Sequence, residues 1–90
     1  MNYVYVVTEL TQESNKEKVL SDSFAFSSRD KAVEFLHGRY DRARLMADSG
    51  SGEFSADYSD DGWYVVIDND GDLHEGYVSE GMVVDGRALP

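Results

Sequence analysis

The residues best suited to bind a ligand or a metal ion lie in one acidic segment, Asp68-Asn69-Asp70-Gly71-Asp72. Aspartates at alternate positions are typical of the start of an EF-hand loop, where their oxygens coordinate calcium. The remainder of that loop is missing, because Leu73 stands where glycine is required and Ser79 where a bidentate glutamate is required. We therefore interpret the segment as an acidic hairpin turn, with a weak calcium contact as the alternative. The sequence predicts no cofactor and no metal needed for folding.

Other patterns that carry catalytic chemistry are missing from the sequence. The chain has no cysteine, which excludes disulfides, thiolate nucleophiles and cysteine zinc sites. His37 and His74 do not stand at the spacing of a zinc-binding helix, and we expect both to be ordinary, partly exposed residues. Ser27 and Ser28 precede an expected helix and lack the glycines of a nucleophile elbow. The sequence thus predicts a protein that is not an enzyme.

The charge of the chain is concentrated in its second half. Asp and Glu total 18 against 8 Lys and Arg, which gives a formal net charge of −10. Residues 1–47 carry seven acids and seven cations, so the excess falls in residues 48–90, with eleven acids and only Arg87. Acidic surfaces repel phosphate backbones and anionic membranes, which argues against binding nucleic acid or membranes directly. Solubility is one explanation of the acidity, and attraction of a basic protein surface is the other.

The acids that we predict to form a partner-binding surface are those in the turns and on the outward strand positions of the second half. They are Asp57, Asp60, Asp61, Asp68, Asp70, Asp72 and Glu75.

The first half of the chain predicts two strands and a helix. Residues 3–10 are β-branched and aromatic on both faces, which indicates a central strand, and residues 19–26 alternate so as to bury one face. Ser27-Ser28-Arg29-Asp30 fits a capping box with Ser27 as the N-cap, and an apolar stripe over 32–47 continues the helix. Gly38 inside this helix should cost about 1 kcal/mol relative to alanine, and we expect it to permit close packing against the sheet.

The second half predicts a meander of short strands over residues 54–58, 63–67 and 73–78. A three-residue loop at 69–71, with a bulge at the glycine, joins the last two strands and sets their register. Ile67 then lies opposite Leu73, and Trp63 lies opposite Tyr77. We expect Trp63 to anchor the core of the meander.

Two further breaks are expected near the end of the chain. Gly81 should separate the return strand from a short last strand at 82–84, and Asp85-Gly86 should form a turn. The fold class that follows is α+β, with the order ββα and then a β-meander. Its architecture is two-layered, an antiparallel β-sheet with one α-helix packed on one face and the other face partly open. Residues 1–90 are expected to form a single small acidic domain.

The opening of the chain resembles that of many small uncharacterised bacterial and phage proteins. The resemblance rests on residues 4–8, Val-Tyr-Val-Val-Thr, on residues 24–32, Phe-Ala-Phe-Ser-Ser-Arg-Asp-Lys-Ala, and on Phe35-Leu36. In these proteins a strand pair runs into a capped helix, so the resemblance implies the fold of the first half and a bacterial or phage setting. It implies no activity.

These observations predict a non-enzymatic, acidic protein-binding module that engages a basic protein surface, such as that of a nucleic-acid-binding protein. By size and charge it compares with anti-restriction and anti-CRISPR inhibitors that mimic DNA, which is an analogy only. The alternative is a structural or accessory domain that forms a homodimer or larger oligomer through an open sheet face or an edge strand. The start of the chain lacks the pattern of a signal peptide and no cysteine is present, so we expect a cytoplasmic location.

Overall fold

The computed structural model describes residues 2–14, 16–17, 19–84 and 87–88. Its elements are β1 (Asn2–Gln12), β2 (Val19–Phe26), α1 (Arg29–Asp48), β3 (Ser55–Ser59), β4 (Trp63–Ile67), β5 (Leu73–Val84) and β6 (Arg87–Ala88). The order of two strands, a helix and a meander confirms the predicted α+β fold.

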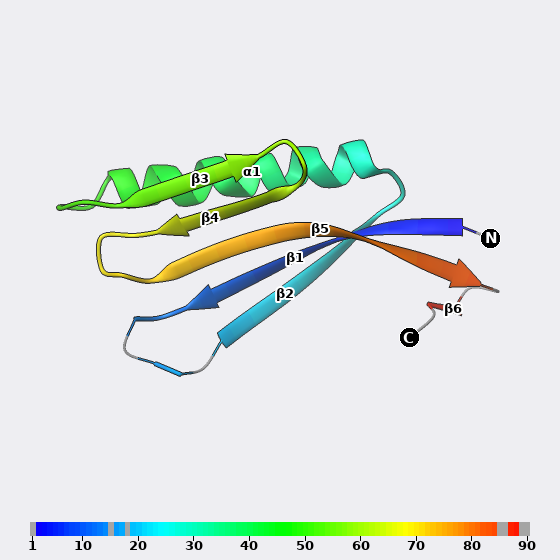
Figure 1. The fold of residues 1–90 in the computed structure, drawn as a ribbon, viewed down its shortest axis with the longest axis horizontal. Coiled ribbons are helices and arrows are strands. Elements are labelled where there is room, and N and C mark those ends of the chain that lie inside the picture. The colour runs from blue at the N-terminus through cyan, green and yellow to red at the C-terminus, as the bar shows by residue number, and fades with distance from the viewer. Residues whose placement is uncertain (1, 15, 18, 85–86, 89–90) are drawn as a thin grey trace.

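The strands form one antiparallel sheet in the order β2-β1-β5-β4-β3, and β6 pairs with the end of β5 (Figure 1). The N-terminal strand β1 therefore lies in the interior of the sheet, between β2 and the last long strand. This position confirms that the strand is central, although α1 covers only the face of β1 that carries the buried Val7. β2 and β3 are left as the two outer strands of the path.

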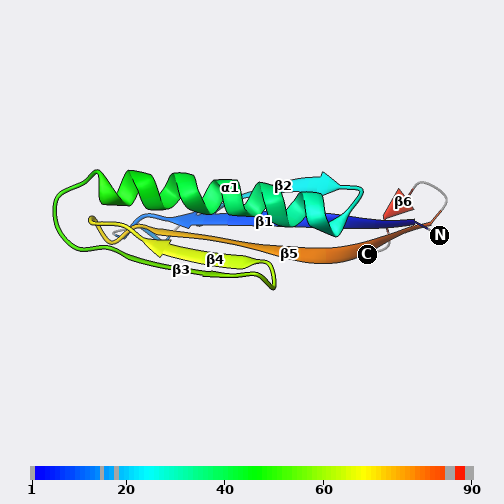
Figure 2. The same ribbon diagram turned by 90° about the horizontal axis from the view of Figure 1, so that it is seen from above.

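The helix α1 lies along one side of the sheet, as the view in Figure 2 shows. Val7, Val66 and Leu36 are fully buried where α1 meets β1 and β4. The Phe35 ring packs between those of Phe24 and Phe26, with centroid distances of 4.9 and 5.1 Å. Burial of these side chains is what holds the helix on the sheet.

The start of the helix differs from the expected capping box by one residue. Ser28, and not Ser27, is the N-cap, and its hydroxyl accepts from the Lys31 N–H at 3.2 Å. Two serines in succession offer two possible N-caps, and the second one is used. The first helical residue is Arg29, and its guanidinium donates to the Asp61 carbonyl at 2.8 Å. That contact joins the first turn of α1 to the turn between β3 and β4.

The expected role of Gly38 is wrong. A Cβ built on Gly38 meets no atom within 4 Å, so this glycine faces solvent and makes no close approach to the sheet.

The expected break at Gly81 is also wrong. β5 continues through Gly81 to Val84, and Gly81 pairs with Val4 of β1. An 11-residue interior strand needs a partner for its backbone along its whole length, and this requirement outweighs the weak strand preference of one glycine. The turn expected at residues 85–86 lies outside the described residues.

The hairpin between β4 and β5 has the predicted loop and register. The Asp68 N–H donates to the Asp72 carbonyl at 3.0 Å, which closes a three-residue loop, and Gly71 has a φ of 85°. Positive φ is costly for other residues, so glycine is needed there. Trp63 pairs with Tyr77, and Ile67 pairs with Leu73.

Candidate functional site

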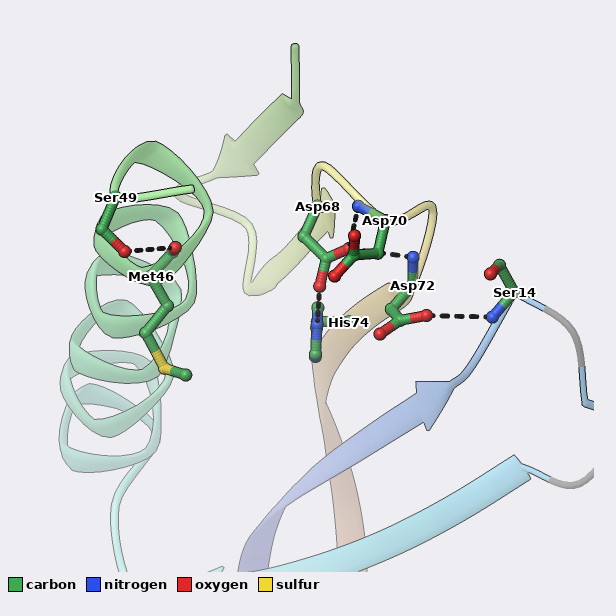
Figure 3. Close-up of polar contacts among 7 residues, drawn as sticks. All are labelled: Ser14, Met46, Ser49, Asp68, Asp70, Asp72 and His74. Carbon is green, nitrogen blue, oxygen red and sulfur yellow. Dashed lines mark hydrogen bonds and ion pairs between the residues drawn. The ribbon is translucent and has the colours of Figure 1, made fainter. Parts of the chain in front are cut away.

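The acidic turn between β4 and β5 gathers three of the seven predicted site residues (Figure 3). One oxygen from each of Asp68, Asp70 and Asp72 lies within 4.8 Å of the others. Asp68 Oδ1 accepts from the backbone N–H groups of Asp70 and Asp72, both at 3.0 Å, and its Oδ2 lies 3.2 Å from His74 Nε2. Asp72 Oδ1 accepts from the Ser14 N–H at 3.0 Å. The turn is thus held by its own carboxylates and is tied to the end of β1.

The electrostatics of the turn favour ionised Asp68. Burial opposes the charge of this carboxyl, but hydrogen bonds from His74 and from the backbone N–H groups outweigh it and lower the pKa of Asp68. His74 is half-buried and directed at Asp68, so it is more constrained than the ordinary residue we expected. His37 is exposed and stacks on Tyr58, with a centroid distance of 4.8 Å.

A groove of about 450 Å³ separates this turn from the second half of α1. Its walls are Arg39, Arg42, Ala43, Met46, Ala47 and Gly50 on one side, and Asp68, Asn69, Asp70, Asp72 and His74 on the other, over a floor of Glu9, Thr11 and Tyr64. The groove therefore has a cationic and an anionic wall.

The floor of the groove contains a polar network that the sequence did not reveal. Glu9 Oε1 accepts from Arg39 Nε at 2.8 Å, and Glu9 Oε2 accepts from the Tyr64 hydroxyl at 3.0 Å. Arg39 also lies 5.2 Å from the ring centroids of Phe24 and Phe35. Burial raises the pKa of the Tyr64 phenol, and the neighbouring Glu9 charge raises it further. The sequence signal that could have indicated this network is Glu9, a single acid on the helix-facing side of the mostly apolar strand β1.

The sheet face opposite α1 carries exposed apolar side chains. Trp63 and Tyr77, directly opposite each other, have 41% and 43% of their surface exposed, and Ile67 has 42%. Figure 2 shows α1 on the other side of the sheet, and no element of the described part of the chain covers this face. We define the open face by Trp63, Tyr77, Ile67, Val65 and Leu73.

The prediction that Trp63 is a core anchor is therefore wrong. Alternation correctly placed Trp63, Val65 and Ile67 on one face of β4, but α1 packs on the other face, where Tyr64 and Val66 are buried. Both faces of this strand are apolar in sequence, so the pattern alone does not tell which face the helix covers.

The seven predicted acids occupy three separate places. Asp68, Asp70 and Asp72 form the acidic turn at one end of the β4–β5 hairpin, and Asp60 and Asp61 lie in the turn at the other end of β4. Asp57 of β3 and Glu75 of β5 lie on the open face. Each is directly opposite Val65, because β4 lies between β3 and β5. The structure thus brings two of the acids to the apolar surface and three to the groove.

Comparison of the chain with protein-family models, with curated protein sequences and with solved structures finds no match. Within the described ranges, no helix is both long enough and apolar enough to cross a membrane.

Proposed function

We propose that this protein is a non-enzymatic binding module whose open face holds a basic protein partner. The observation that carries the proposal is the pair of Trp63 and Tyr77, two large aromatics left more than two-fifths exposed beside each other on a helix-free face. Tryptophan and tyrosine dominate the energetics of protein interfaces, because they bury much area with little loss of side-chain freedom. Contiguous exposed apolar surface of this kind is typical of interaction sites.

Charge supports a basic partner over a neutral or acidic one. On the open face the described strands place the acids Asp57 and Glu75 and no lysine or arginine. The net charge of −10 attracts a basic protein from a distance and accelerates encounter, while the aromatic pair supplies the short-range contact. Two copies packed through the open face would instead bring the acids together. We therefore assign this surface to a different protein.

We extend the proposal to inhibition in the cytoplasm. A basic surface that meets an acidic module is often one that binds nucleic acid, so occupancy by this protein would compete with nucleic acid for it. The support is charge and size alone, as it is for the comparison with anti-restriction and anti-CRISPR inhibitors. The lack of cysteine suits a reducing compartment.

Affinity capture with matched tyrosine variants tests the proposal. The protein is immobilised and exposed to an extract of cells that carry its gene, and the captured proteins are identified and purified. Tyr77→Ala and Trp63→Ala should each weaken binding of the purified partner by at least about tenfold, which corresponds to 1.4 kcal/mol. Tyr3→Ala is the control. Tyr3 is 53% exposed, but it lies on the other face of β1 from Thr8, the residue that pairs with Tyr77, and so it is not on the open face.

The partner should be basic, and its affinity should fall as salt is raised. If Tyr3→Ala and Tyr77→Ala bind alike, or if the partner is acidic and insensitive to salt, the proposal fails. A competition assay tests the inhibition. If the purified partner binds nucleic acid, addition of this protein should release the nucleic acid from the partner.

A further inference from the structure

The outer edge of β2 is a long strand edge that no strand of the described residues covers. Its eight residues pair with β1 on one side from Phe26 to Val19 without a skipped residue, and no strand of the described chain pairs with the other side. Figure 1 shows β2 as the outermost strand of the sheet. Folded proteins usually protect such an edge with short length, charged side chains (lysine above all), proline or a bulge. β2 has eight residues, no proline, no lysine and no bulge, and Asp22 is its single charged residue.

The other edge of the sheet is protected. β3 has only five residues and lies in the acidic half of the chain. The Tyr58 N–H within it donates to the Asp57 carboxylate at 2.9 Å, so a side chain already occupies this backbone donor. A second chain would therefore pair with β2 in preference to β3.

We propose that two copies of this chain form a homodimer by antiparallel pairing of β2 with β2. A twofold axis perpendicular to the sheet relates such strands and keeps each face on the same side. Residues directly opposite each other must share a face, so the axis passes through one residue. An axis at Asp22 would oppose two like charges, whereas an axis at Ser23 opposes two small hydroxyls and pairs residues 20–26 of each strand. The register with Ser23 on the axis is the one that we infer.

This register gives Leu20 and Asp22 new neighbours across the strand edge. Leu20 is 56% exposed, and it comes to lie opposite Phe26 of the second copy. Asp22 pairs across its own sheet with Glu9, a like charge on the same face. In the dimer it lies opposite Phe24 of the second copy, and Arg39 sits over the equivalent ring at 5.2 Å. Asp22 thereby meets the guanidinium of the other chain.

The net charge is also compatible with this pairing. Residues 1–47, which include β2, carry no net charge, and the acidic meanders lie toward the two far ends of the combined sheet. The two open faces then lie side by side on one surface. Repulsion between the meanders is screened by salt, so added salt should strengthen self-association.

The test is the mass of the protein in solution by sedimentation equilibrium. The wild type should have twice the 10.1 kDa of one chain. Ser23→Lys, which places two lysines on the axis, should return the mass to that of one chain while circular dichroism stays unchanged. Ser55→Lys is the matched control, because Ser55 is exposed on the same face of the other edge strand, and it should remain a dimer. An equimolar mixture of Ser23→Lys and Ser23→Glu should dimerise again.

Three outcomes would overturn the dimer: a wild-type mass of one chain at roughly 100 μM, a Ser23→Lys variant that stays dimeric, or a mixture that stays monomeric. Trp63→Ala should leave the mass unchanged, so loss of partner binding and loss of the dimer are separate results. If Trp63→Ala alone dissociates the dimer, two copies meet through the open face, and both proposals are wrong.

Discussion

Gly76 on β5 is the position where a single methyl group should most disturb the packing of α1 on the sheet. It lies between Glu9 of β1 and Tyr64 of β4 in the register. A Cβ built on Gly76 lies 2.5 Å from Tyr64 Cε1 and 2.9 Å from Leu36 Cδ1, both closer than carbon atoms tolerate. The position does not have positive φ, so alanine fits the backbone and the cost is steric alone.

Neither Tyr64 nor Leu36 can move away easily from that methyl group. The Tyr64 ring is held by its hydroxyl, which donates to Glu9 at 3.0 Å, and Leu36 is fully buried under α1. Overpacking of a filled core costs about 1–3 kcal/mol. For a domain of this size each kcal/mol lowers Tm by about 4–8 °C, so Gly76→Ala should melt about 4–24 °C below the wild type.

Thermal and urea unfolding of Gly76→Ala, followed by circular dichroism, measure this cost. Gly81→Ala is the matched control on the same strand, because its Cβ lies 3.5 Å from Val4 Cγ2, an ordinary contact. It should unfold within about 1 kcal/mol of the wild type, since alanine reduces the freedom of the unfolded chain. Equal melting of Gly76→Ala and Gly81→Ala would show that α1 and Tyr64 do not pack against β5 as described.

Three further predictions follow from exposure, burial and solvent contact. Trp63 is the only tryptophan and is 41% exposed, so acrylamide should quench its native fluorescence, though less than in urea, and a native emission shielded from acrylamide would contradict the open face. The folded state raises the pKa of Tyr64, first by burial and then by Glu9, so this phenol should add no pH dependence to stability below about pH 10 and should make stability fall above it; Tyr64→Phe should reduce that alkaline loss, and equal losses would refute the assignment. Gly38→Ala should raise the free energy of unfolding by about 1 kcal/mol, because the site is an open helix position, and no gain in urea would argue against it.

The strand pattern could be predicted from the sequence because alternation is local. Residues 23–26 and 54–58 show it clearly, and the register of Ile67 with Leu73 followed from one glycine-containing loop. The identity of the covered face could not be predicted, because it depends on where α1 docks after the chain reverses. Trp63 and Tyr64 are equally plausible core residues in sequence, and only the helix decides between them.

The candidate site shows the same limit. Asp68, Asp70 and Asp72 are close in sequence, so their proximity could be predicted. Glu9 and Arg39 come from β1 and α1, and their contact with β4 depends on the whole topology. For the same reason the sequence did not show that the acids would divide among two turns and the open face.

The central claim is that the open face holds a basic partner, and the indole N–H signal of Trp63 tests it most directly. In a ¹H–¹⁵N spectrum of labelled protein, the single tryptophan gives one side-chain peak. Addition of the purified partner should shift or broaden this peak together with the amide peaks of β4 and β5. A partner that binds while the Trp63 peak stays unchanged, with shifts confined to the acidic turn at Asp68–Asp72, would contradict the account.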